Sequence, residues 1–222
     1  MRKFVPAYEG NLRKHALSVP RCISECSGIR VFGRRIKSLV FSTDVAIIKN
    51  INADAIIAVY PFTPQPAITQ AIIGVSEVPV FCGVGGGLTN GVRSASMAAY
   101  VEHQGAYGVV CNSKIGVETI HAIKDAVEIP VVYTVISENT DIQPYLTAGG
   151  DIINVSGAAR TPEIVGALRQ RYPELPIIAT GGPTEESILA TIRAGANAIT
   201  YTPPSSASLF AKTMADNRSE LE

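Results

Sequence analysis

The sequence is short of the residues that mark several large classes of protein. Only 17% of its 222 residues are charged, against 46% that are hydrophobic, and this balance argues against a disordered chain. Lys and Arg together number 19, as do Asp and Glu, so the chain lacks the basic surplus typical of nucleic-acid binding. No apolar run reaches the roughly 18 residues of a membrane span. We therefore expect neither nucleic acid nor membrane as a partner.

Cysteine and histidine are also scarce. The four cysteines form no Cys-x-x-Cys pair and the three histidines are scattered, so no metal site is predicted. Cys22 and Cys26 are four residues apart, which places them on one face of a helix rather than in a metal-binding turn. The first residues are not followed by the apolar segment of a signal peptide. Reduced thiols and the lack of this segment predict a cytoplasmic protein.

What the sequence does contain is a repeat. Three apolar runs begin at a proline, in Val78-Pro79, Ile129-Pro130 and Leu175-Pro176. Proline is tolerated at the first position of a strand because the ladder of hydrogen bonds has not yet begun. Other apolar runs alternate with these, and they follow small turn-forming residues at Asn52, Gln104, Ala148 and Ala194.

The repeat predicts eight short, buried strands with helices between them. Each run is apolar on both faces, as strands of a covered parallel sheet are. The predicted strands are Leu39–Thr43, Ala55–Tyr60, Val80–Gly83, Tyr107–Asn112, Val131–Ile136, Asp151–Ser156, Ile177–Thr180 and Ala198–Thr202. Eight strand–helix units in one chain of this length indicate an α/β fold of the (β/α)8 TIM barrel type. A doubly wound open sheet is the alternative.

The chain is expected to form one domain. Residues 1–38 precede the first strand and are predicted to form an N-terminal capping segment, with a short helix near Cys22 and an extended stretch over Ile29–Ile36. Residues 39–216 are assigned to the barrel, and residues 217–222 to a frayed tail. A homo-oligomer is also expected, because the helix containing Met97–Val101 is unusually apolar; its packing on the barrel is the alternative explanation.

Polar residues at the strand ends are the candidates for catalysis. Strand side chains alternate between faces, and barrel active sites lie where the strands end. Asp44, in phase with Ser42 and Val40, is predicted to transfer a proton, while Asn112 and Lys114 bind the reacting end of the substrate. The alternative for Asp44 is a structural ion pair with a lysine. No predicted strand contains a lysine, which counts against a Schiff-base aldolase.

The same alternation directs a second group of small polar residues into the barrel. They are Thr134, Asn154, Ser156, Thr200 and Thr202. Buried polar groups need partners, so hydrogen bonds within this group and to buried water would explain them without a ligand.

Glycines mark the ends of three strands, in Gly83–Gly87, Ser156-Gly157 and Gly181-Gly182. Backbone N–H groups approach an anion closely at such positions, and the start of the next helix favours negative charge. The loops after strands 7 and 8 are where barrels most often bind phosphate. The sequence therefore predicts a phosphate site formed by Ser156, Gly157, Gly181, Gly182, Ser205 and Ser206.

The segment Pro176–Ile188, followed by Ala194–Thr200, resembles the last quarter of the phosphate-binding (β/α)8 barrel superfamily. That superfamily includes ribulose-phosphate-binding enzymes, keto-deoxy-phosphogluconate aldolases, thiamine phosphate synthase and several flavin barrels. The resemblance implies that Gly181 and Gly182 donate N–H groups to a phosphate. After strand 8 the chain departs from the superfamily, because Pro203 and Pro204 remove two donors. The chain also resembles bacterial barrels that are often labelled hydrolase, although it shows no hydrolytic triad.

Four functions remain open from the sequence. The first is an enzyme, a lyase or isomerase, that acts on a small phosphorylated metabolite without a cofactor. The second is an oxidoreductase barrel that binds flavin mononucleotide (FMN). The third is a non-catalytic ligand sensor, since the last two strands also resemble those of the glycerol-operon antiterminator barrel. The fourth is a hydrolase.

Overall fold

The computed structural model describes residues 4–8, 10 and 17–219, and it shows a closed barrel of eight parallel strands. The strands neighbour one another in the order β10-β3-β4-β5-β6-β7-β8-β9. Their bounds are β3 Ser38–Phe41, β4 Ala55–Ala58, β5 Val80–Gly85, β6 Gly108–Cys111, β7 Val131–Val135, β8 Ile152–Val155, β9 Ile177–Thr180 and β10 Ala198–Tyr201. The predicted fold is confirmed, and each of the eight predicted strands coincides with one of these. The open-sheet alternative is wrong.

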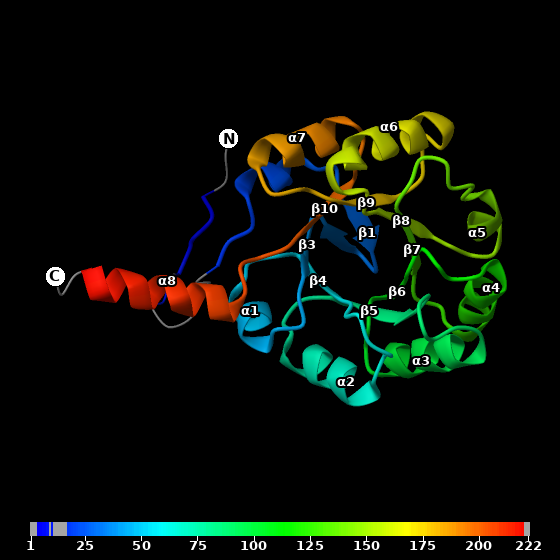
Figure 1. Cartoon of the computed structure of the whole chain (residues 1–222), viewed down its shortest axis with the longest axis horizontal. Coiled ribbons are helices and arrows are strands. Elements are labelled where there is room, and N and C mark those ends of the chain that lie inside the picture. Colours follow the sequence, from blue (N-terminus) through cyan, green and yellow to red (C-terminus); the bar gives the residue numbers. More distant parts are fainter. Residues whose placement is uncertain (1–3, 9, 11–16, 220–222) are drawn as a thin grey trace.

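A helix follows each strand of the barrel, and most of these helices lie on its outside (Figure 1). Their bounds are α1 Val45–Asn50, α2 Pro66–Val75, α3 Val92–His103, α4 Val117–Ala126, α5 Gln143–Thr147, α6 Thr161–Arg171, α7 Glu185–Arg193 and α8 Ser206–Ser219. Two short 3-10 helices, η1 Arg21–Glu25 and η2 Ala158–Arg160, complete the set in the described residues. None of the described helices is long and apolar enough to span a membrane.

Two apolar layers account for the alternation along the strands. Outward residues such as Val40 and Ile199 pack against the surrounding helices and η1 in the larger core. Inward residues such as Leu39, Phe81 and Val132 form a second, smaller core inside the barrel. Because neighbouring side chains point to opposite faces, the β3 side chains that point into the barrel are those of Leu39 and Phe41.

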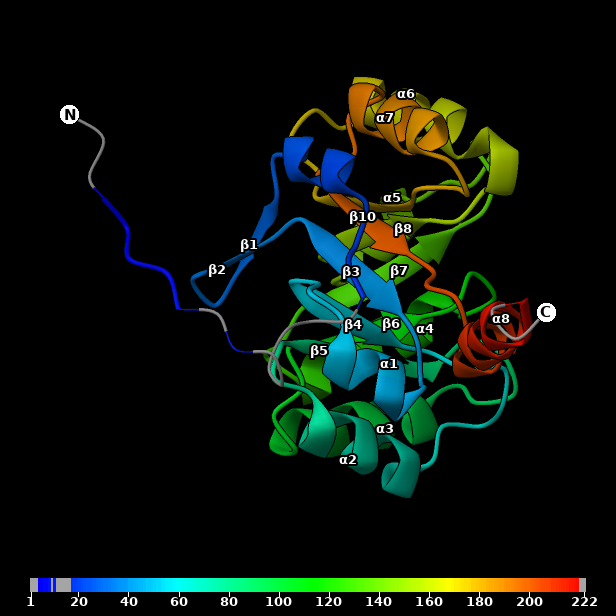
Figure 2. The same cartoon turned by 90° about the vertical axis from the view of Figure 1, so that its left-hand side faces the viewer.

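A hairpin closes the end of the barrel at which the strands begin. Strands β1 (Ile29–Val31) and β2 (Arg34–Ile36) pair antiparallel, and Val31 and Ile36 are buried within the inner core. The two turn residues, Phe32 and Gly33, both have positive φ, which matches the tight turns that suit the twist of a hairpin. Figure 2 shows this hairpin at one end of the barrel and α8 at the other.

Helix α8 differs from the other helices because it extends away from the barrel (Figure 1). None of its residues is buried, and Phe210 is 74% exposed. It runs to Ser219, so the first residues of the stretch assigned to a frayed tail are helical. Residues 220–222 of that tail, and residues 1–3, 9 and 11–16 of the predicted capping segment, lie outside the described part of the chain.

Candidate functional site

A cavity of about 500 Å³ opens where the strands of the barrel end. Inward residues of all eight strands, or of the loops that follow them, contribute to its wall. Its lining comprises Phe41, Ile57, Val59, Tyr60, Pro61, Phe62, Thr63, Pro64, Gly83, Gly85, Gly87, Leu88, Thr89, Val110, Asn112, Thr134, Asn154, Ser156, Thr180, Thr200 and Thr202. Volume and position are those of a small-molecule site.

The two halves of this cavity differ in polarity. The wall formed by β7, β8, β9 and β10 carries hydroxyl and amide groups, at Thr134, Asn154, Ser156, Thr180, Thr200 and Thr202. The wall formed by β3, β4, β5, β6 and the loops that follow them is mainly apolar or glycine, and its polar residues are Tyr60, Thr63, Thr89 and Asn112. No Asp, Glu, Lys, Arg or His is among the lining residues. A ligand therefore meets a wall of neutral hydrogen-bonding groups opposite an apolar one.

The polar wall has an inner tier and an outer tier. Thr200 is 6% exposed, and Thr134 and Asn154 are partly buried, whereas Ser156 and Thr202 are exposed at the rim. The Asn154 Nδ2 group donates a hydrogen bond to Thr134 Oγ1 at 3.3 Å. Asn154 Oδ1 and Thr200 Oγ1 are buried without a partner. The predicted inward direction of these residues is confirmed, but hydrogen bonds within the group leave two buried polar atoms of the cavity wall without a partner.

Glycines after β5 position Asn112. The Gly86 backbone has φ +102°, and an added Cβ there would lie 2.8 Å from the Asn112 nitrogen. Asn112 N–H in turn donates to the Gly85 carbonyl at 2.9 Å. The glycine run thus permits a close approach of two loops, which directs Asn112 into the cavity. Lys114 lies two residues further on, is exposed, and does not line the cavity.

The structure places Asp44 differently from the sequence-based prediction. Because Leu39 and Phe41 are the inward residues of β3, Val40, Ser42 and Asp44 are in the outward phase, and the predicted inward phase is wrong. Asp44 is the N-cap of α1, and its carboxylate accepts hydrogen bonds from the backbone N–H groups of Ala46 and Ile47.

The Asp44 carboxylate also accepts a hydrogen bond from Ser206 Oγ. This bond is the main reason that the pKa of Asp44 lies below its ordinary value, and the two helix N–H groups lower the pKa further. Asp44 makes no ion pair with a described residue, so the lysine pairing offered as an alternative is also not observed. A proton-transferring role for Asp44 stays a prediction, and the lowered pKa favours a helix cap that is ionised at neutral pH.

Several groups of the predicted phosphate site already have partners within the chain. Gly157 N–H donates to Thr161 Oγ1 at 3.0 Å, and Gly181 N–H donates to the Thr200 carbonyl at 3.2 Å. Ser205 Oγ accepts from the backbone of Ser208 at the start of α8. These bonds leave few free donors for an anion.

The helix that follows Gly182 is also poorly suited to an anion. Thr184 and Ser187 cap the N-terminus of α7 reciprocally, and Glu185 and Glu186 occupy its first turn. Their negative charges oppose the attraction that a helix N-terminus offers to phosphate. Gly182 has φ +82°, and an added Cβ would lie 2.6 Å from Ser187 Oγ, so glycine is required there by the backbone itself.

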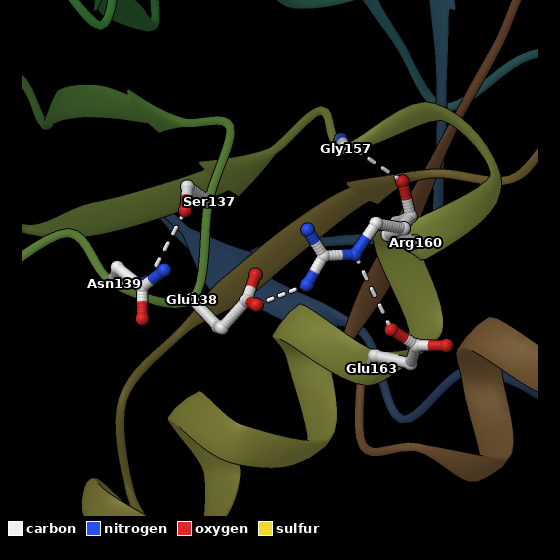
Figure 3. A network of polar contacts seen from close by, with 7 residues as sticks. Ser137, Glu138, Asn139, Gly157, Arg160 and Glu163 are labelled. Atoms are coloured by element: carbon white, nitrogen blue, oxygen red, sulfur yellow. Dashed lines mark hydrogen bonds and ion pairs between the residues drawn. The ribbon is translucent and has the colours of Figure 1, made fainter.

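An ion-pair network joins two loops beside the cavity (Figure 3). Arg160, at the end of η2, pairs with Glu138 in the loop after β7 and with Glu163 on α6. A hydrogen bond from its own backbone, followed by the hydrogen bond and charge of Arg160, holds the pKa of Glu138 below its ordinary value. The network fixes the loops after β7 and β8 relative to each other and contributes no lining residue.

Sequence reasoning missed the part of the site that comes from the loop after β4. Tyr60, Pro61, Phe62, Thr63 and Pro64 line the cavity, and the Tyr60 hydroxyl accepts a hydrogen bond from the Gln65 N–H at 2.8 Å. The two prolines and two aromatic residues within five positions were the available signal for an ordered loop at this rim.

No protein-family model and no curated protein sequence matches this chain. Solved structures do match it. A 2,3-dimethylmalate lyase, a member of the PEP mutase/isocitrate lyase superfamily, has a TM-score of 0.64 and 14% identity over 90% of this chain and 85% of that protein. A phosphoenolpyruvate phosphomutase from Streptomyces platensis subsp. rosaceus has a TM-score of 0.61 and 16% identity, covering 82% of this chain and 80% of that protein.

A phosphonopyruvate hydrolase solved with oxalate and Mg²⁺ is similar to the same degree, with a TM-score of 0.61, 16% identity, and coverage of 83% and 80%. At these identities the likeness establishes the barrel fold alone. Membership of the phosphate-binding superfamily that the sequence resembles stays a prediction.

The cavity of this chain does not offer the donor set that Mg²⁺ prefers. Protein-bound Mg²⁺ is normally held through one or two carboxylates, and the lining residues include none. Across the described part of the chain, no cluster of three or more His, Cys, Asp or Glu side chains is placed to share a metal. We therefore derive no chemical step through a metal ion.

Proposed function

We propose that the barrel binds a small metabolite in its 500 Å³ cavity and acts on it as a lyase or isomerase. The observation that carries the proposal is a pair of buried polar atoms without a partner, Asn154 Oδ1 and Thr200 Oγ1, in two residues that line the cavity. Unsatisfied buried groups destabilise a fold, and they are retained where a ligand completes them. Similar barrels that are named as lyase, mutase and hydrolase support an enzyme of this general kind.

The substrate of this proposal carries a phosphate, phosphonate or carboxylate at its outer end. Two of the similar structures are enzymes named for phosphonopyruvate and phosphoenolpyruvate. In this chain the hydroxyls of Ser156 and Thr202 lie at the exposed rim of the cavity, where the anion would be held. Of the phosphate site predicted from the sequence, Ser156 is the residue that lines the cavity, and Thr202 is added to it here.

The proposed chemistry assigns a binding role to Asn112 and a charge-stabilising role to Lys114. Asn112 lines the cavity, and the Lys114 N–H lies 3.4 Å from Asn112 Oδ1. The lysine ammonium on its flexible side chain can approach a negative charge that develops near Asn112. Among the lining residues, Tyr60 is the one whose side chain is ionisable.

A second candidate function is ligand binding without catalysis. The observation that favours it is the uncharged lining, which contains no carboxylate, imidazole or ammonium group to move a proton. The two functions differ in turnover, since a sensor would bind the molecule and return it unchanged. Binding of FMN is distinguished from both by the yellow colour of the purified protein. A hydrolase is distinguished by the release of product from a phosphate ester or an amide.

A thermal-shift screen of small phosphorylated and carboxylated molecules tests the proposal. A ligand at 100 times its Kd adds about 2.7 kcal/mol to the free energy of unfolding, which is readily detected. The shift should disappear in Ser156→Phe, which places a ring at the exposed rim of the cavity, and persist in Ser96→Phe on the exposed face of α3. If no molecule of either class produces a shift that depends on Ser156, the proposed function is wrong.

A further inference from the structure

The inner tier of the polar wall contains two buried polar atoms that lack a hydrogen-bond partner. Asn154 uses its Nδ2 group on Thr134 Oγ1, while its Oδ1 atom is buried and unpartnered. Thr200, on the other side of β9, is 94% buried, since its exposed fraction is 6%, and its hydroxyl is also unpartnered. An amide oxygen only accepts hydrogen bonds. The ligand group that bonds to Asn154 Oδ1 must therefore be a hydrogen-bond donor.

The surroundings of these atoms exclude a charged group. Val110 and Ile57, across the cavity, are buried apolar residues of the inner core. No cationic side chain lines the cavity, so a phosphate or carboxylate placed beside Asn154 Oδ1 would be desolvated without a counter-charge. It would also be repelled by the partial negative charge of the amide oxygen. The anionic end of a ligand is consequently confined to the rim, near Ser156 and Thr202.

We propose that Asn154 is a specificity-determining residue that selects ligands with a hydroxyl or N–H donor at their inner end. The inference rests on the proposed function and narrows its substrate class to hydroxylated or aminated small molecules with the acidic group at the opposite end. The donor of the ligand bonds to Asn154 Oδ1, and the Thr200 hydroxyl, which can donate or accept, bonds to the same or an adjacent polar group. The remaining face of the ligand lies against Phe41, Ile57 and Val110.

Matched pairs of phosphates test this inference by isothermal titration calorimetry. The probes are glycerol 3-phosphate against n-propyl phosphate, and ribose 5-phosphate against 2-deoxyribose 5-phosphate. Members of a pair share the phosphate and differ in hydroxyl groups. A site built to bond a hydroxyl rejects the analogue that lacks it, so in at least one pair the hydroxylated member should bind at least about tenfold more tightly to the unmodified protein.

The variants identify the residue responsible. In Asn154→Leu, which is close in size to the original, the preference within that pair should fall to about one. Thr200→Val, an isosteric change, serves as a second test if the leucine variant does not fold, and it should reduce the same preference. Asn50→Leu is the matched control, because Asn50 lies at the end of α1 and its side chain bonds to the Ala46 carbonyl of that helix, away from the cavity; it should keep the original preference.

The outcomes separate this inference from the function on which it rests. If the paired phosphates bind equally well to the unmodified protein, or if Asn154→Leu keeps the full preference, the inference is overturned while ligand binding stands. If neither member of either pair binds while the screen finds another ligand, the inference is overturned and the proposed function stands. If the screen of phosphorylated and carboxylated molecules is also negative, the proposed function fails, and the inference fails with it.

Discussion

The Ser206 hydroxyl at the start of α8 donates a hydrogen bond of 2.5 Å to the Asp44 carboxylate at the start of α1. The two residues are 162 positions apart in the sequence. The bond joins the chain after the last strand to the helix after the first strand, beside the seam at which β10 pairs with β3. Two residues that the sequence assigned to catalysis and to phosphate binding thus bind each other.

We expect Asp44→Asn to lower the free energy of unfolding by about 1 kcal/mol, the difference between a charge-assisted and a neutral hydrogen bond. Asparagine is as good an N-cap as aspartate, so the loss arises mainly from the bond to Ser206. Urea unfolding of both proteins at neutral pH measures the change. A catalytic Asp44 would instead lose about 10²–10⁴ in turnover with little change in stability, and that result would restore the role predicted from the sequence.

The acid dependence of stability gives a second measurement on the same residue. The folded-state pKa of Asp44 is lowered, so its contribution is fully present above the pKa of the unfolded chain and is lost as the pH falls through the folded-state pKa. Between neutral pH and strongly acidic pH, the stability difference between the original protein and Asp44→Asn should therefore shrink. A difference that is constant over this range would show that the carboxylate charge contributes nothing.

Thr200→Val should raise the free energy of unfolding by about 1 kcal/mol, because it replaces a buried hydroxyl without a partner by a methyl group of the same shape. Thr161→Val is the matched control. Thr161 is also buried, but its hydroxyl accepts the Gly157 N–H, so its removal should cost about 1–3 kcal/mol. Thermal unfolding of the unliganded proteins compares them. Equal destabilisation by both substitutions would mean that the Thr200 hydroxyl is satisfied in solution.

Gly85→Ala should destabilise the protein by about 1–3 kcal/mol, the usual cost of forcing an extra group into a packed region. An added Cβ would lie 2.1 Å from Ser94 Oγ and 2.6 Å from the Thr89 carbonyl oxygen. Gly87→Ala, two residues away, meets nothing within 4 Å and should have little effect. Chemical denaturation distinguishes the two. A neutral Gly85→Ala would show that the loop after β5 rearranges freely.

Shortening the chain to end at Ser208 should change the free energy of unfolding of the barrel by less than about 1 kcal/mol, as surface changes usually do. None of the residues of α8 is buried, and the shortened chain keeps the Ser206 bond to Asp44. Circular dichroism melts of both chains provide the measurement. A large loss of stability would require a contact that α8 makes outside a single copy of the chain.

Assembly remains a prediction, but its original basis is wrong. Met97, Ala98 and Val101 are buried on α3 in the main core of the chain, so the apolar stretch packs internally. The exposed Phe210 and Met214 of α8 are the stronger reason to expect a homo-oligomer. Light scattering should show a larger particle for the full chain than for the chain that ends at Ser208. A monomer in both cases would contradict the predicted homo-oligomer.

The sequence by itself determined the fold, because its signals are local. Apolar runs of strand length recur in every unit, and their entries alternate between proline and small turn-forming residues; each of these signals follows from backbone geometry within a few residues. The cap of α7 is equally local, because Thr184 and Ser187 bond to each other's backbone within one helical turn.

Only the tertiary structure decided which residues form the site. The side-chain phase of β3 depends on its pairing register with β4 and β10, and a shift of one residue exchanges the two faces of a strand. For that reason Phe41 lines the cavity and Asp44 caps a helix. Whether a hydroxyl or an N–H group is free to bind a ligand depends on distant partners, as the bonds of Ser206 to Asp44 and of Gly181 to Thr200 show. Such partners are set by the closure of the barrel, and no local pattern in the sequence records them.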